Sequence, residues 1–193
     1  MTLFIGKRAK LLMVPLARGL MRLGLSALAL TILGFSAAVV AGVLFALGHP
    51  RLAALAVFVS GILDSADGTV ARLSGGETRA GAFLDSAIDR YCEGVVFFGL
   101  LVNYLYDGAL SSVLLTFGAM SGAFFVSYMR ARLEGLGREC RAGVLERPDR
   151  VILLGAGALL GATGLLVALW LIAILSHFTA LQRVRYAIRI LRG

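Results

Sequence analysis

Long runs of apolar residues restrict this chain to a fold that places helices in lipid. The runs cover residues 23–50, 52–63, 91–129 and 151–182. A helix needs roughly 20 residues to cross a bilayer, so the last two runs are too long for one crossing each. Each is better explained by a helical hairpin, which turns near 106–112 in one run and near 161–164 in the other.

We therefore predict an all-α integral membrane protein with six transmembrane helices. Of the 193 residues, 59% are hydrophobic and 16% are charged, which leaves too little polar surface to cover a water-soluble domain of this size. One domain is expected over 1–193, with an arm over 1–25 and a six-helix bundle over 26–188. The predicted spans are 26–47, 52–73, 81–105, 110–132, 148–161 and 165–188.

The N-terminal arm is expected to contain an amphipathic helix over 9–24 that lies in the membrane interface. Arg18 and Arg22 are one helical turn apart, and leucines occupy the other side of the same helix. A basic face opposite an apolar face is typical of helices that lie on a membrane surface.

The distribution of basic residues predicts the orientation of the chain. Lysines and arginines gather in the arm, in the 72–79 connection, in 130–150 and in the tail, whereas Arg51 is alone on the opposite side. The positive-inside rule then places both termini in the cytoplasm, in a multi-pass protein of the cell membrane. The net charge of +8 is explained by this topology and by attraction to anionic membrane lipids, so no nucleic-acid partner is expected.

Four aspartates lie inside the predicted spans, where a bare charge is costly and an acid is a functional candidate. Asp64 and Asp67 share a face of the second span, and Asp85 and Asp89 share a stripe of the third. The two helices run antiparallel through a short loop, so Asp64 pairs in depth with Asp89, and Asp67 with Asp85. The four acids are predicted to line a shallow cavity that opens to the cytoplasm.

Four carboxylates this close together must take up protons or bind cations. Two divalent ions would balance their charge, and hard oxygen ligands favour Mg²⁺ or Mn²⁺. Paired divalent ions are typical of enzymes that displace a group at phosphorus. Gly68, Ala71 and Gly81 leave room either for a nucleotide or for close helix packing, and Arg72 is a candidate phosphate ligand.

The spacing D-x2-D-G-x2-A-R-x8-G-x3-D-x3-D, from Asp64 to Asp89, resembles the complete signature of the CDP-alcohol phosphotransferase family. The resemblance implies a membrane enzyme, usually homodimeric, that transfers a substituted phosphoryl group from a CDP-linked donor to an alcohol and releases CMP. It implies a two-metal site of Asp64, Asp67 and Asp85, with Asp89 close to the metals and acting as general base on the acceptor hydroxyl. The CDP-binding residues that it implies are Asp64, Gly68, Ala71, Arg72, Gly81 and Thr31.

A second resemblance covers nearly the whole chain. The stretches "PLARGLMRLGL", "SYMRARLEGLG" and "ERPDR" look like those of phosphatidylinositol phosphate synthases and archaetidylinositol phosphate synthases. This likeness implies CDP-diacylglycerol or CDP-archaeol as donor and inositol 1-phosphate as acceptor, and arginine forks suit such a phosphomonoester. The acceptor phosphate would bind to Arg130, Arg132, Arg147, Arg150 and Arg183. Topology alone is the other explanation for these arginines.

Two other functions remain open from the sequence. A phosphatidylglycerophosphate synthase would share the same motif and use glycerol 3-phosphate as the acceptor. A divalent-cation transporter, from another class, would use the acids as a pathway. Beyond Asp64 and Asp89, however, the outward halves of the spans are almost free of ionisable groups apart from Glu93. A site closed at its outer end favours an enzyme, and Glu93 could orient one of its ligands.

Overall fold

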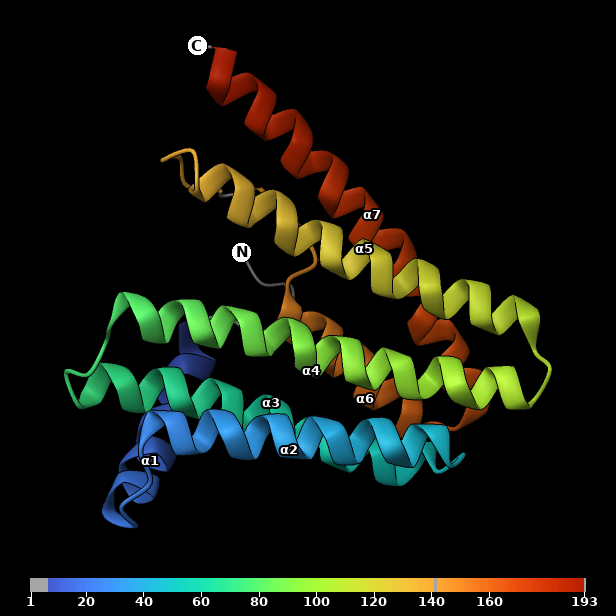
Figure 1. Cartoon of the computed structure of the whole chain (residues 1–193), viewed down its shortest axis with the longest axis horizontal. Helices are drawn as coiled ribbons and strands as arrows, with labels where there is room; N and C mark the ends of the chain where they lie inside the picture. The colour runs from blue at the N-terminus through green and yellow to red at the C-terminus, as the bar shows by residue number, and fades with distance from the viewer. Residues whose placement is uncertain (1–6, 141, 193) are drawn as a thin grey trace.

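The computed structural model describes residues 7–140 and 142–192, which fold into seven helices and no strand (Figure 1). The first six residues of the predicted arm lie outside the described residues. The helices are α1 (Lys7–Arg22), α2 (Ala27–Ala46), α3 (Pro50–Leu73), α4 (Arg79–Tyr106), α5 (Leu110–Glu134), α6 (Arg147–Leu159) and α7 (Ala162–Arg192).

The six predicted spans coincide with α2 to α7. Both hairpin turns are where the sequence predicted them, and each has a glycine in the left-handed region, Gly108 (φ 66°) and Gly161 (φ 87°). Glycine adopts this conformation without the steric cost that a Cβ adds. The largest difference is at α7, which begins three residues earlier than predicted and continues to Arg192.

Within the described part of the chain, four helices are long and apolar enough to cross a membrane: α2, α3, α5 and α7. Helix α4 has 28 residues but carries Asp85, Asp89, Arg90 and Glu93. Helix α6 has only 13 residues, a rise of about 20 Å against a hydrocarbon core of about 30 Å. The structure therefore confirms an all-helical fold with four candidate spans, while six crossings remain a prediction.

Helices α3 and α4 both pack against other helices of the chain. Helix α2 packs against both of them, α5 packs against α4 and α7, and α6 packs between α3 and α7. Figure 1 shows α2, α3 and α4 running side by side, with α7 crossing α5 so that its C-terminal end projects away. Helix α1 packs on α3, where Ala17 lies with Leu30, Ala66 and Val70.

Two glycines bring α2 and α4 into backbone contact. A Cβ atom on Gly99 of α4 would overlap the carbonyl group of Gly42 in α2, and one on Gly42 would lie 2.7 Å from the carbonyl oxygen of Val95. Small residues at such a crossing are a common way for membrane helices to pack. The contact fixes the height of α4 relative to α2.

The segment before α6 is fastened to α5 and α7. The Leu145 N–H donates to Thr179 Oγ1 (3.1 Å), and Arg183 donates from Nε to the Ala142 carbonyl (2.9 Å) and from Nη1 to the Val126 carbonyl (2.6 Å). At the start of α6, the Glu146 N–H donates to Asp149 Oδ2 (3.0 Å), which satisfies a backbone donor left free at a helix end. These bonds set where α6 begins, and Arg147 is its first residue.

Candidate active site

Three carboxylates meet between α3 and α4. Asp64, Asp67 and Asp85 each offer an oxygen atom, and these atoms all lie within 4.8 Å of one another. The N-terminal cap of α4, where the Gly81 N–H donates to Thr78 Oγ1 (2.9 Å), starts that helix so that Asp85 faces α3. The structure thus brings together three of the four acids that helical spacing predicted to share a cavity.

Asp89 joins this cluster through an arginine. Arg147 Nη1 of α6 lies 2.6 Å from Asp64 Oδ2 and 2.7 Å from Asp89 Oδ1. The predicted pairing of Asp64 with Asp89 across the two helices is therefore present, with one guanidinium nitrogen in contact with both carboxylates.

Thr31 of α2 contacts the acidic cluster directly. Its hydroxyl donates to Asp67 Oδ2 at 2.7 Å, and Asp67 is buried, with 4% of its surface exposed. The sequence placed Thr31 among the CDP-binding residues, whereas the contact present in this structure orients a carboxylate.

The charges of the site are unevenly balanced. Asp64 and Asp89 share Arg147, but in the part of the chain that the structure describes neither Asp67 nor Asp85 has an ion pair. Two adjacent carboxylates without a cation, among apolar helices, favour a bound divalent ion. The oxygen-only donor set fits Mg²⁺ or Mn²⁺, as the sequence predicted.

A cavity of about 490 Å³ opens beside the acids, within the usual size range of small-molecule sites. Gly68, Arg72 and Asp85 line one side, and the first two turns of α6 line the other with Arg147 and Val151. Arg72 donates from Nη2 to Thr69 Oγ1 (3.1 Å). Of the predicted CDP-binding residues, Asp64, Gly68 and Arg72 line this cavity, whereas Thr31, Ala71 and Gly81 do not.

The five predicted acceptor arginines occupy different surroundings. Of these five, as far as the structure describes their contacts, Arg147 alone pairs with Asp64 and Asp89. Arg130 pairs with Glu134 (2.8 Å) on the exposed end of α5, Arg132 is exposed on the same helix, and Arg183 is buried against backbone carbonyls.

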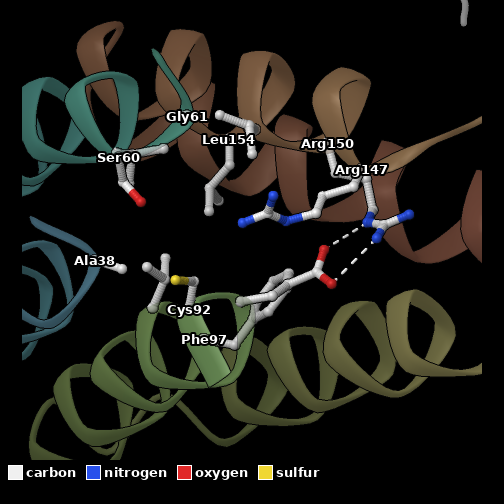
Figure 2. A pocket seen from close by; sticks show the side chains of 12 residues that line it. Ala38, Ser60, Gly61, Cys92, Phe97, Arg147, Arg150 and Leu154 are labelled. Atoms are coloured by element: carbon white, nitrogen blue, oxygen red, sulfur yellow. Dashed lines mark hydrogen bonds and ion pairs between the residues drawn. The ribbon is translucent and has the colours of Figure 1, made fainter. Parts of the chain in front are cut away.

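Arg150, the fifth arginine of the predicted acceptor site, forms an ion pair with Glu93 in this structure. Its Nε lies 2.6 Å from Glu93 Oε1 and its Nη2 lies 3.1 Å from Glu93 Oε2. Figure 2 shows Arg147 and Arg150 extending from α6. The two dashed lines mark the contacts of Arg150 with the Glu93 carboxylate. The signal in the sequence was the spacing: Glu93 is one turn beyond Asp89, and Arg150 is one turn beyond Arg147.

A carboxylate cluster in a cavity among apolar helices, with an arginine between two of the acids, defines a metal-dependent membrane enzyme suited to phosphate-bearing substrates. Comparison with known proteins gives the family. The model of the CDP-alcohol phosphatidyltransferase family matches residues 25–182. The chain belongs to this family and is a transferase, which sets aside the cation-transporter alternative.

The relatives of this chain include two kinds of synthase. It is 39% identical over 182 residues to the phosphatidylinositol phosphate synthase of Mycobacteroides abscessus. This match covers 91% of this chain and 82% of that protein. It is 36% identical over 172 residues to the archaetidylinositol phosphate synthase of Methanothermobacter thermautotrophicus, covering 86% and 84% of the two chains.

Solved structures of the Mycobacterium tuberculosis phosphatidylinositol phosphate synthase have the same fold. The crystal structure with CDP-DAG bound matches with a TM-score of 0.82 and 35% identity, covering 91% of this chain and 92% of that one. The crystal structure in complex with manganese and citrate matches with a TM-score of 0.80 and 36% identity, covering 91% and 88%.

Proposed function

We propose that this transferase moves a phosphatidyl or archaetidyl group from a CDP-linked lipid to inositol 1-phosphate and releases CMP. The observation that carries the proposal is the position of Arg147, whose guanidinium lies between Asp64 and Asp89 beside a three-carboxylate cluster. That arrangement supports a role for Arg147 in phosphate binding beside Asp89, the candidate base. The names of the relatives and the CDP-DAG and manganese complexes of a protein with the same fold support the choice of substrates and metal.

The donor would bind in the 490 Å³ cavity. Gly68 would let the nucleotide approach the α3 backbone, and Arg72 would contact its phosphates. The family resemblance adds Asp64, Ala71, Gly81 and Thr31 to this set. The lipid tails would leave the cavity toward the apolar surfaces of the neighbouring helices, which accept an ester-linked or an ether-linked chain.

The acids would hold Mg²⁺ or Mn²⁺ through Asp64, Asp67, Asp85 and Asp89. Bound there, two such ions would neutralise the pyrophosphate of the donor and so stabilise the charge that builds up during transfer. Thr31 would keep the Asp67 carboxylate turned toward the site through its 2.7 Å hydrogen bond.

Asp89 would act as the general base. It would take the proton of the acceptor hydroxyl while that oxygen forms a bond to the lipid-bearing phosphorus. The bond from this phosphorus to the oxygen that bridges to the cytidylyl phosphate would break, and CMP would leave with the electron pair. No covalent enzyme intermediate is needed.

Arg147 would bind the phosphate of the acceptor, together with Arg130, Arg132, Arg150 and Arg183. Arg130 and Arg183 are close enough to interact electrostatically, with Arg130 exposed and Arg183 buried. A doubly charged phosphomonoester suits several arginine forks.

In the membrane, we propose six crossings formed by α2 to α7, with both termini and the active site on the cytoplasmic side of the cell membrane and with α1 lying in the interface. The basic residues near the helix ends support this orientation, and four of the six helices have the length and composition of spans. We also propose a homodimer, on the family resemblance alone.

The deciding experiment uses purified protein with Mn²⁺, CDP-diacylglycerol or CDP-archaeol, and a panel of acceptors, with CMP release as the readout. Release with inositol 1-phosphate and not with free inositol or glycerol 3-phosphate is expected. Release with glycerol 3-phosphate alone would make the protein a phosphatidylglycerophosphate synthase instead.

A further inference from the structure

The arginine near the C-terminal end of α3 is held by a neutral side chain. Arg72 donates from Nη2 to Thr69 Oγ1 at 3.1 Å, and the Thr69 hydroxyl donates in turn to the Ser65 carbonyl at 2.9 Å. A hydroxyl has one hydrogen to donate, so with Ser65 as its acceptor it presents a lone pair to the guanidinium. Thr69 is 5% exposed, and its β-branched side chain is stiff. The acceptor of the Arg72 hydrogen bond is therefore fixed in the helix.

This hydrogen bond holds the guanidinium in the proposed donor cavity. Thr69 and Arg72 both line that cavity. A Cβ atom on Gly68 would lie 3.5 Å from Arg72 Nη1, so the guanidinium lies alongside the glycine at which the nucleotide is proposed to approach α3. Arg72 is an exposed side chain, and ordering such a long side chain on a ligand costs affinity. The hydrogen bond to Thr69 lowers that cost before the donor binds.

The contact with Thr69 also leaves the charge of Arg72 uncompensated. Among the described residues, no carboxylate forms an ion pair with Arg72, whereas Arg147, which lines the same cavity, is paired with two carboxylates. A carboxylate in the place of the Thr69 hydroxyl would compete with the phosphates of the donor for the guanidinium. The hydroxyl orients the guanidinium without neutralising it.

We propose that Thr69 is a positioning residue of the donor site: its hydroxyl holds the Arg72 guanidinium beside Gly68, in the orientation that receives the phosphates of the CDP-linked lipid. The inference rests on the proposed function for the role of Arg72. Thr69 occupies one of the two unspecified positions between Gly68 and Ala71 in the family signature, so the signature alone assigns it no role.

The test compares Thr69→Val, which has nearly the same shape without the hydroxyl, with Thr69→Ser, which keeps the hydroxyl. In Thr69→Val the CDP-lipid KM rises about threefold to tenfold, the cost of ordering one freed arginine side chain, while the acceptor KM changes less than twofold. In Thr69→Ser the CDP-lipid KM stays within about twofold of the wild-type value. Thr116→Val in α5 is the matched control and keeps both KM values, because the Thr116 hydroxyl also donates to a carbonyl four residues earlier (2.7 Å) but lines no part of the donor cavity.

A double variant decides whether Thr69 acts through Arg72. Binding of CDP in the presence of Mn²⁺ is measured by isothermal titration calorimetry. Thr69→Val weakens CDP binding about threefold to tenfold in the wild-type background, and less than twofold in an Arg72→Met background, because the side chain that Thr69 orients is gone. Equal losses in the two backgrounds, or an unchanged CDP affinity in Thr69→Val, would overturn the inference.

The calorimetric measurement separates this inference from the proposed function, since CDP binding needs no acceptor. If the wild-type protein uses glycerol 3-phosphate and not inositol 1-phosphate, the proposed acceptor is wrong, and CDP binding by the same variants still decides the role of Thr69. A wild-type protein that binds no CDP would overturn both.

Discussion

Arg147 of α6 and Asp89 of α4 lie 2.7 Å apart, in direct contact at the edge of the carboxylate cluster. Both are proposed to act on the same substrate, Asp89 on the hydroxyl of the acceptor and Arg147 on its phosphate. An acceptor that contacts both must therefore carry its two functional groups close together.

Replacing Asp89 by Asn should reduce kcat by about 10²- to 10⁴-fold, the usual contribution of a general base. The amide has a similar shape but cannot take up the acceptor proton. Binding of the CDP-lipid should persist, because Gly68 and Arg72 are unchanged. The measurement is CMP release alongside CDP-lipid binding by isothermal titration calorimetry. Asp107→Asn, at the exposed far end of α4, is the matched control and should keep full activity.

Replacing Asp67 by Asn should weaken Mn²⁺ binding by about tenfold or more, since a neutral amide loses one charge from a hard-oxygen site. Chelation of divalent ions should abolish turnover of the wild-type protein, and added Mn²⁺ or Mg²⁺ should restore it. Mn²⁺ titration measures the affinity, with Glu77→Gln in the exposed α3–α4 connection as control. Full activity in a preparation stripped of metal would rule out the metal site.

Replacing Arg147 by Gln should raise the acceptor KM by about ten- to a hundredfold, the loss expected for a charge-assisted hydrogen bond. The same change should tighten Mn²⁺ binding, because Asp64 and Asp89 no longer share a guanidinium. Steady-state kinetics with varied acceptor measures the first effect. The control is Arg189→Gln, which removes an equal charge from the exposed end of α7. An unchanged acceptor KM in Arg147→Gln would contradict the assignment.

Replacing Gly99 by Ala should destabilise the protein by about 1–3 kcal/mol or more, the typical cost of overpacking. The new methyl group overlaps the Gly42 carbonyl, so α2 and α4 must separate. Gly118→Ala is matched in chemistry and also lies within a helix, but its methyl group meets nothing within 4 Å. Thermal unfolding in detergent should show a lower Tm for the first variant only.

The proposed orientation can be tested with the natural cysteines. Cys140 lies in the partly exposed segment between α5 and α6, whereas Cys92 is buried in α4. A membrane-impermeant maleimide should label Cys140 in inverted vesicles and not in intact cells. Ser111→Cys, at the exposed start of α5, should be labelled from outside the cell. Labelling of Cys140 in intact cells would reverse the topology.

The sequence predicted the fold well where one physical signal dominates. Apolar runs and turn glycines such as Gly108 and Gly161 located the helices to within a few residues, and the 3.6-residue period placed Asp64, Asp67 and Asp85 together. Helical periodicity shows which residues share a face, and for two helices joined by a short loop this also shows which residues meet.

The sequence was least informative about contacts between elements far apart in the chain. The arginines near 130–150 all satisfied the positive-inside rule equally. The one-turn spacing of Arg147 and Arg150 matches that of Asp89 and Glu93, but this match is informative only once α6 is known to lie beside α4. Likewise, Thr31 is a common residue in an apolar helix, and its bond to Asp67 depends on how α2 packs against α3. Such partners follow from tertiary packing.

The hydrogen bonds that hold Ala142 and Leu145 to α7 have an evolutionary consequence. All four aspartates come from the α3–α4 hairpin, whereas the arginine beside them is delivered by a separate segment tied down through Thr179 and Arg183. Under the proposed function, the acids that act on the donor and the arginine that binds the alcohol's phosphate therefore come from different parts of the polypeptide. Mutations in the second part can change which alcohol is used while the first part is left intact, so one ancestral scaffold could diversify into enzymes for many lipid headgroups.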